Sequence, residues 1–348
     1  MNEFIIFKTL NLYNNKAILI MIEVINLTKV FRKPVRQEGV FGMFKTLFSR
    51  KYEETTAVNS INFKINDGEI VGYIGSNGAG KSTTIKMLCG ILMPTSGKVL
   101  IDNEEPYKKR KKIANKIGVV FGQKTQLWWD IALIETFKIL KDIYQISDQE
   151  YEERLSFINE VLGIKEFINQ PVRTLSLGQR MRADLAASWI HNPEILFLDE
   201  PTIGLDVLVK QKIRDAIKLM NEKYHTTVIL TTHDMTDIEN LCSRVILIDK
   251  GNIIYDGPLS NIKHKFGDLR TVEIRTKKDL DIDSLDRFNN LVTYTKNDCS
   301  ISISFDNDEI KLETIVDYAF KSLGATDMKI SEISIEQVVK SILAKEDK

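Results

Sequence analysis

Short hydrophobic runs alternate with longer helical patterns along the first three quarters of the chain. The runs rich in β-branched residues lie at residues 22–27, 61–65, 70–74, 99–101, 118–121, 195–198, 227–230 and 244–249. Those that begin at residues 70, 118, 195 and 227 are continuous rather than alternating, which is typical of strands buried on both faces of a parallel sheet. The pattern therefore predicts an α/β fold with a mainly parallel sheet as its core.

Residues 131–172 carry no strand pattern and are predicted to form helices. The stretch LSLGQRMRADLAASWI, at residues 175–190, also has apolar residues at helical spacing. We therefore expect a helical subdomain over about residues 131–180, inserted after the strand that ends at Phe121. The basic run KKRKK at residues 108–112 is interpreted as the solvated face of a helix.

The hydrophobic pattern changes after Phe266. The segments TVEIRT and SISISF alternate between apolar and polar residues and predict half-buried strands. Ser334 and Gln337 have the spacing of a capping box for a last helix that continues through Leu343. An amphipathic helix between these elements is predicted from Leu312, Ile315, Val316, Ala319, Phe320 and Leu323. Residues 266–348 are thus predicted to form a small C-terminal α+β accessory domain.

Two segments near the N-terminus do not fit the α/β pattern. Residues 1–20 are expected to be a loose extension, because Met21 begins the strand-like MIEVINLTKVF and is the expected natural start. Residues 32–57 form an insertion in which aromatic residues fall near one helical face among basic residues. They are Phe41, Phe44, Phe48 and Tyr52. This face packs on its own domain, or it contacts a membrane protein or lipid headgroups.

Composition and charge limit the classes of function. The chain has 348 residues, 43% of them hydrophobic, and can bury a large core; its length suggests two domains or one domain with an appendage. It has 48 basic and 48 acidic residues, so no overall basic field attracts nucleic acid or an anionic membrane. Cys89, Cys242 and Cys299 form no metal-ligand spacing, which favours a reducing, cytoplasmic compartment. The best apolar run, residues 17–22, is far shorter than the about 18–20 residues of a membrane-spanning helix.

A glycine-rich segment carries the strongest chemical signal. GSNGAGKST, residues 75–83, follows an apolar strand and precedes a helical pattern, as a phosphate-binding loop requires. Backbone N–H groups of such a loop surround phosphates, Lys81 neutralises the β and γ oxygens, and the Ser82 hydroxyl is suited to Mg²⁺. The predicted phosphate-binding residues are Gly75, Ser76, Asn77, Gly78, Ala79, Gly80, Lys81, Ser82 and Thr83.

Two carboxylates follow the apolar run at residues 195–198. Asp199 stands at the carboxyl end of the predicted strand, where it can hold the Mg²⁺ shell. Glu200 points elsewhere and is the candidate to polarise a water for in-line attack on the γ-phosphate. Beside a phosphate loop, this pair predicts hydrolysis of a nucleoside triphosphate.

A second anion site is predicted at Ser176 and Gly178, at the start of the helical pattern. The first N–H groups of a helix have no partner within the helix and suit an anion. One nucleotide does not need two such sites from one chain, so this second site requires a further explanation.

Five segments, in this order, resemble the ATP-binding subunits of ABC transporters. They are GSNGAGKST, LSLGQ at residues 175–179, LFLDEP, GLD at residues 204–206 and TTHD at residues 231–234. LSLGQ is the most specific, although Leu177 replaces the glycine of the commonest form. The resemblance covers about residues 21–265. It implies a P-loop NTPase cassette with a mainly parallel sheet core, an antiparallel β edge and a helical subdomain, in which ATP and Mg²⁺ are the cofactors.

The resemblance also implies roles for individual residues. Gln123 senses Mg²⁺ and the attacking water, with Gln126 as a second candidate. His233 contacts the γ-phosphate and Phe31 stacks on adenine. Mg²⁺ is then held by Ser82, Gln123 and Asp199, and the catalytic residues are Glu200, His233 and Gln123.

The resemblance explains the second anion site. In this family two chains pack head to tail, as homodimers or heterodimers, and each signature caps the nucleotide held by the other chain. The residues that act in this way are Ser176, Leu177, Gly178, Gln179 and Asp206. ATP then forms part of the interface, so that binding closes the dimer and hydrolysis releases it.

A membrane partner follows from the same resemblance. The ATPase is expected to dock peripherally on a separate integral membrane permease, at the cytoplasmic face of the membrane, through a groove beside Gln123 and the helical insert. Trp128 and Trp129 either anchor this contact or pack under the helical subdomain. The phrases VVFGQKTQLWWD and LSLGQRMRADLAAS look most like cassettes paired with six-helix exporters of the drug and antibiotic type.

Other classes fit the sequence less well. An ABC-type ATPase that acts on DNA or ribosomes is the alternative, and such proteins carry a long coiled coil, two cassettes or zinc-binding cysteine pairs. About 95 residues separate Lys81 from Ser176, which leaves no room for a long coiled coil. A P-loop kinase would not need LSLGQ or TTHD. No nucleic-acid partner is therefore expected.

Overall fold

The structure is a computed structural model that describes residues 20–34, 52–122, 124–265, 269–276, 288, 291–297, 300–332 and 338. The chain divides into two compact units, Met1–Asp256 and Gly257–Lys348. Residues 1–19 of the predicted 1–20 extension, most of the 32–57 insertion and the capping box at residues 334–337 lie outside the described residues, and Ile20 is the first residue of a strand. Gln123 lies outside them as well. Of the helices in the described ranges, none combines the length and hydrophobicity required to cross a lipid bilayer.

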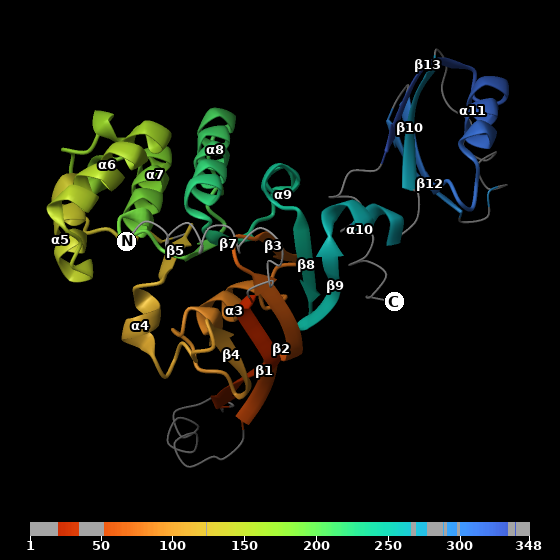
Figure 1. The fold of residues 1–348 in the computed structure, drawn as a ribbon. Coiled ribbons are helices and arrows are strands. Elements are labelled where there is room, and N and C mark those ends of the chain that lie inside the picture. The colour runs from red at the N-terminus through yellow and green to blue at the C-terminus, as the bar shows by residue number, and fades with distance from the viewer. Residues whose placement is uncertain are drawn as a thin grey trace, which may run out of the picture. The chain divides into compact units, whose positions relative to one another are not determined.

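A six-stranded sheet is the main sheet of the first unit (Figure 1). Its order is β5-β6-β7-β3-β8-β9, and the strands from β5 to β8 run parallel. The strands are β3 (Ile70–Gly75), β5 (Ile117–Phe121), β6 (Ile195–Asp199), β7 (Thr227–Thr231), β8 (Arg244–Asp249) and β9 (Asn252–Pro258). The hydrophobic pattern predicts each of them except β9, and the structure confirms these predictions.

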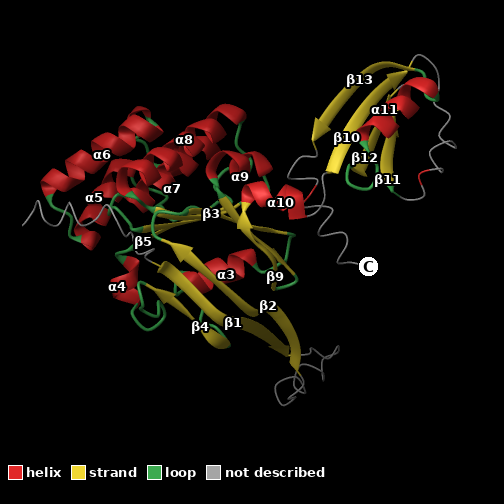
Figure 2. Ribbon diagram, turned by 45° about the vertical axis from the view of Figure 1, so that its right-hand side comes forward, coloured by secondary structure: helices red, strands yellow, loops and turns green. Residues whose placement is uncertain are grey.

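A three-stranded antiparallel sheet packs on one face of the main sheet (Figure 2). It has the order β2-β1-β4, with β1 (Ile20–Pro34), β2 (Tyr52–Asn66) and β4 (Ser96–Ile101). Helix α3 (Lys81–Leu88) packs in the same core, where Ile22, Ile85, Tyr73 and Phe197 are buried together. Burial of each such side chain contributes about 1.5–3 kcal/mol, so this core fixes α3 firmly against both sheets.

Helices cover the other face of the main sheet (Figures 1 and 2). They are α5 (Leu133–Tyr144), α6 (Asp148–Leu162), α7 (Leu177–Trp189), α8 (Val207–Tyr224) and α9 (Met235–Leu241), with short 3-10 helices at Ile164–Glu166 and Val172–Thr174. A Cβ at Gly72 would lie 2.8 Å from Ile238 Cδ1, so only glycine lets α9 approach β3 this closely. The helices predicted over residues 131–172 are confirmed.

The described part of the 32–57 insertion is strand. β1 and β2 pair without a break in strand assignment from Ile20 opposite Asn66 to Pro34 opposite Tyr52. The helical interpretation of Tyr52 is therefore wrong. The β-branched Thr55 and Thr56 favour the extended conformation, and Arg32 Nε lies 2.7 Å from Glu54 Oε1 across the strands. Phe41, Phe44 and Phe48 lie outside the described residues.

The basic run at residues 108–112 begins the short helix α4 (Arg110–Ala114). All five of these basic residues are exposed, which confirms the interpretation as a solvated face. Lys108 and Lys112 form ion pairs with Glu105 and Glu104. Exposed pairs of this kind contribute little to stability.

In the described residues of the second unit, a four-stranded antiparallel sheet packs against one helix, α11 (Leu312–Lys321). The sheet has the order β11-β12-β10-β13. Its elements are β10 (Leu269–Thr276), β11 (Val292–Asn297), β12 (Ser300–Asp306), α11 (Leu312–Lys321) and β13 (Ala325–Glu332), and α10 (Leu259–Lys265) precedes them. The sequence predicts β10, β12 and α11, and the structure confirms them. It misses β11 and β13, whose exposed residues give no clean alternation.

Candidate nucleotide-binding site

The predicted phosphate loop connects the central strand β3 to the N-terminus of α3. Gly80 has a φ of 108°, and a Cβ there would lie 2.4 Å from the Ala57 carbonyl oxygen of β2. A Cβ at Gly75 would lie 2.0 Å from the Ile248 carbonyl oxygen of β8. Any side chain at these two positions would therefore push the loop off the strands that hold it. Asn77 and Gly78, at the tip, are exposed.

Lys81 folds back over this loop. Its Nζ donates to the carbonyl oxygens of Gly75, at 2.7 Å, and Ser76, at 2.9 Å, and only 7% of the residue is exposed. Burial lowers the pKa of Lys81, while the nearby charges of Glu200 and Asp199 raise it. The ammonium group is thus held at the mouth of the loop, where phosphate oxygens would replace the two carbonyl acceptors.

The carboxyl ends of β6 and β7 bring the carboxylates to the same edge of the sheet. Asp199 is paired in register with Thr231, whose hydroxyl donates to Asp199 Oδ1 at 2.5 Å. Thr231 is fully buried, and the sequence does not predict its role. Its position at the start of the TTHD segment is the signal that could have indicated it. The hydroxyl fixes the orientation of Asp199 toward the loop.

Glu200 leaves the strand in an unusual conformation. Its φ is 57°, and its backbone N–H donates to the Thr231 carbonyl at 2.9 Å. His233 Nε2 lies 2.8 Å from Glu200 Oε1. Because a carboxylate only accepts, Nε2 carries the proton in this contact. Because of this turn the side chains of Asp199 and Glu200 point in different directions, and the Glu200 carboxylate contacts His233.

Lys81, Asp199, Glu200 and His233 therefore form one cluster around the loop. Ser82 lies in the first turn of α3, and it is exposed. Gly122, the residue before Gln123, donates its N–H to the Asp199 carbonyl at 2.8 Å, so Gly122 lies beside this cluster. Phe31 lies on β1 and is 38% exposed. It is paired with Thr55 of β2, which is two residues before Ala57, whose carbonyl lies against the loop.

The second predicted anion site is the N-terminus of α7. Ser176 Oγ accepts from the Gln179 N–H, and Gln179 Oε1 accepts from the Ser176 N–H, which forms a capping box. A Cβ at Gly178 would lie 3.3 Å from Val209 of α8, and Gly204 lies against Leu177. Asp206 caps α8 by accepting from the Val209 N–H at 3.0 Å. The structure thus brings Ser176, Leu177, Gly178 and Asp206 together.

The two anion sites lie in different layers of the first unit. Helix α3 lies on the face of the main sheet that carries the three-stranded sheet, whereas α7 lies on the opposite face (Figures 1 and 2). Leu177, in the first turn of α7, is 46% exposed.

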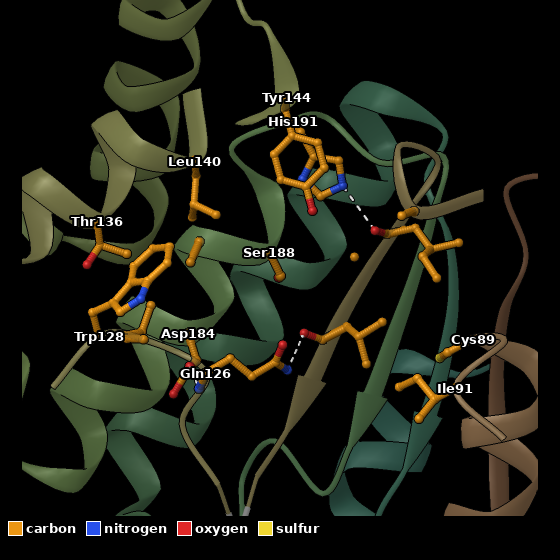
Figure 3. A pocket seen from close by; sticks show the side chains of 16 residues that line it. Cys89, Ile91, Gln126, Trp128, Thr136, Leu140, Tyr144, Asp184, Ser188 and His191 are labelled. Carbon is orange, nitrogen blue, oxygen red and sulfur yellow. Dashed lines mark hydrogen bonds between the residues drawn. The ribbon is translucent and has the colours of Figure 1, made fainter. Parts of the chain in front are cut away.

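A groove of about 310 Å³ lies between β5 and the helices α5 and α7 (Figure 3). Trp128 lines it and is 44% exposed, and Trp129 is 45% exposed with its ring 4.7 Å from Arg180 Cζ. More than half of each tryptophan is covered, so the anchoring role and the packing role both stay predictions. Two buried polar atoms that line the groove, Thr136 Oγ1 and His191 Nδ1, have no hydrogen-bond partner among the described residues.

His191 is a buried histidine that lines the groove. Its ring stacks on Tyr144, with centroids 4.0 Å apart, and Nε2 lies 3.0 Å from the Ile117 carbonyl oxygen. A carbonyl only accepts, so Nε2 carries the proton and Nδ1 presents a lone pair. Burial lowers the pKa of His191 to about 4, which keeps the imidazole neutral near pH 7.

A phosphate loop on β3, paired carboxylates at the end of β6 and a histidine after β7 define a P-loop nucleoside triphosphatase. Comparison with known proteins narrows this class. Residues 58–203 match the family model of the ABC transporter. The chain is 31% identical over 215 residues to the ABC transporter ATP-binding protein NatA of Bacillus subtilis (strain 168), which covers 62% of this chain and 87% of NatA.

Two further similarities agree with this match. The linearmycin resistance ATP-binding protein LnrL of Bacillus subtilis (strain 168) is 33% identical over 218 residues, which cover 63% of this chain and 70% of LnrL. The dimeric ATP-binding cassette MJ0796, in a post-hydrolysis state bound to ADP and Pi, is similar with a TM-score of 0.58 and 28% identity, over 69% of this chain and 99% of that one. The chain belongs to the ATP-binding subunits of ABC transporters and is an ATPase.

Proposed function

We propose that this chain is the motor subunit of an ABC exporter, in which ATP binding and hydrolysis drive transport through a separate membrane permease. The observation that carries the proposal is the pair of anion sites. The cluster of Lys81, Asp199 and Glu200 lies at the carboxyl edge of the main sheet, whereas Ser176 caps α7 in the helical layer. A single chain therefore offers two halves of a site, and two chains complete it.

Each residue of the cluster has its own role in nucleotide binding or hydrolysis. Lys81 and the loop N–H groups bind the phosphates, and Glu200 accepts a proton from the attacking water. His233 orients Glu200 and contacts the γ-phosphate. Phe31 stacks on the adenine ring.

The site also suits Mg²⁺. The exposed hydroxyl of Ser82 and the carboxylate of Asp199, oriented by Thr231, are oxygen ligands of the kind that Mg²⁺ prefers, with Gln123 as a third. When bound, the ion neutralises charge on the β and γ oxygens.

The partner chain docks head to tail. Exposed apolar side chains surround the α7 terminus and the start of α8, namely Leu177, Ile203, Val207 and Leu208. A second copy, or a related ATPase subunit, would cover them when Ser176, Leu177, Gly178, Gln179 and Asp206 cap its nucleotide. The dimeric state of the MJ0796 cassette supports this arrangement.

The permease docks in the groove beside Trp128. The groove offers apolar walls and a partly exposed tryptophan, which are the features of an interface anchor. This places the ATPase peripherally at the cytoplasmic face of the membrane. The resistance function in the name of LnrL supports export of an antibiotic-like substrate.

Co-purification from native membranes tests the transport role. We expect a tagged chain, extracted in mild detergent, to retain a stoichiometric membrane protein with several spanning segments. Trp128→Ala should lower the retained amount about tenfold or more, as loss of a central interface anchor does. Leu219→Ala is the matched control, because Leu219 on α8 is equally exposed at 45% but lies away from the groove lining. Retention of ribosomal proteins or DNA in place of a membrane protein would overturn the proposal.

A further inference from the structure

Asp184 lies on α7 and lines the groove together with Gln126 and Trp128 (Figure 3). Its Oδ1 accepts two hydrogen bonds, from Thr125 Oγ1 at 3.0 Å and from the Gln126 backbone N–H at 3.1 Å. Burial raises the pKa of Asp184 to about 6, and the two donated hydrogen bonds oppose this shift. The Asp184 carboxylate is thus partly desolvated, and its hydrogen bonds hold Thr125 and Gln126 in place.

The segment that Asp184 holds is tied to the main sheet at its other side. Gln126 Nε2 donates to the Val119 carbonyl of β5 at 3.1 Å, and the Lys124 N–H donates to the Phe121 carbonyl at 3.0 Å. Thr125 Oγ1 also accepts from the Leu127 N–H at 3.2 Å. Residues 124–127 therefore bridge β5 and α7.

The two ends of this bridge belong to different halves of the ATP site. On the sheet side, the Gly122 N–H donates to the carbonyl of Asp199, beside the catalytic cluster. On the helix side, α7 begins immediately after Ser176, eight residues before Asp184. A helix rises 1.5 Å per residue, so Ser176 and Asp184 are about 12 Å apart on one rigid element. A shift of the α7 terminus must move Asp184 as well.

We infer that Asp184 is a positioning residue that couples the signature helix α7 to the segment at residues 124–127 and, through Gly122, to the Asp199 end of the hydrolytic cluster. The inference rests on the proposed head-to-tail dimer. Capping of the partner's nucleotide by Ser176 then sets the position of Gly122 and of residues 124–127 at the chain's own nucleotide. In this way a change at one ATP site of the dimer is transmitted through the chain to the other ATP site.

The hydrogen bonds, rather than the charge, carry this coupling. Asp184→Asn keeps an acceptor oxygen at Oδ1, whereas Asp184→Ala removes it. Thr125→Val removes one donor at nearly constant volume. If the hydrogen bond between Asp184 and Thr125 carries the coupling, either Asp184→Ala or Thr125→Val breaks it. The double variant should then lose little more activity than a single one.

Steady-state ATP hydrolysis by the full chain tests the inference. We expect Asp184→Ala to lower kcat about tenfold and to bring the Hill coefficient for ATP down to 1, with KM within about twofold of wild type. Thr125→Val should shift both quantities in the same direction, the double variant should be no worse than Asp184→Ala, and Asp184→Asn should stay close to wild type. A merely structural role would lower the melting temperature but leave the Hill coefficient unchanged.

Wild-type kcat and Hill coefficient in Asp184→Ala would overturn the inference, as would additive losses in the double variant. If wild-type protein hydrolyses ATP without dimerising, the proposed head-to-tail dimer fails and the inference fails with it. The Asp215→Ala variant on α8, whose carboxylate is exposed and accepts only from Gln211 among the contacts seen, is the matched control and should hydrolyse ATP normally.

Discussion

Replacing Glu200 by glutamine is expected to lower kcat for ATP hydrolysis about 100- to 10,000-fold, because the variant loses the base that accepts a proton from water. The amide can still accept the hydrogen bond from His233 that spans 2.8 Å in the native protein. ATP binding should be unchanged, since Lys81 and the loop are intact. The Glu200→Gln dimer should therefore persist with ATP, which gel filtration with light scattering would detect.

A carboxylate near the same strand provides the control. Glu194 is exposed, pairs with Lys116 and precedes β6, so Glu194→Gln should hydrolyse ATP at the wild-type rate. Normal hydrolysis by Glu200→Gln would reject the assignment of the base. Loss of ATP binding in this variant would show that Glu200 has a structural role instead.

Replacing Lys81 by alanine should weaken ATP binding itself. The ammonium group is buried in the loop beside two carbonyl oxygens, and its removal leaves the phosphates without their charged partner. Charge-assisted hydrogen bonds contribute about 1.5–3 kcal/mol, so we expect Kd for ATP to rise about 10- to 100-fold. Equilibrium binding of a fluorescent ATP analogue would measure this change.

Lys86 is the matched control for this variant. It lies in the last turn of the same helix α3 but is exposed, so Lys86→Ala should bind ATP normally. Unchanged affinity in Lys81→Ala would place the phosphates elsewhere.

The sequence predicts the parts of the fold in which the physical signal is local. A continuous apolar run such as residues 195–198 can only be a strand buried on both faces or a short buried helix, and its position before Asp199 favours the strand. The loop at residues 75–83 has a fixed spacing of glycines and one lysine, which explains why its place between β3 and α3 could be predicted.

The remaining features depend on contacts between distant segments. The role of Thr231 follows from the pairing of β6 with β7, and that of Asp184 from the approach of α7 to residues 124–127. Asp184 belongs to no local motif that identifies its partner, and the TTHD segment marks Thr231 without naming Asp199 as its partner. The long pairing of β1 with β2 likewise depends on register across residues 32–57, where an aromatic pattern favoured a helix that the described residues do not form.

The central claim is that each ATP site is built from two chains, and complementation of two inactive chains tests it most directly. Lys81→Ala removes the loop lysine, and Ser176→Arg blocks the signature while its own loop still binds ATP, which also shows that it is folded. If the sites form in trans, a mixture of the two hydrolyses ATP, because one site of the mixed dimer has both halves intact. If the mixture stays as inactive as either chain alone although both bind each other, the two halves do not meet across the dimer and the account is contradicted.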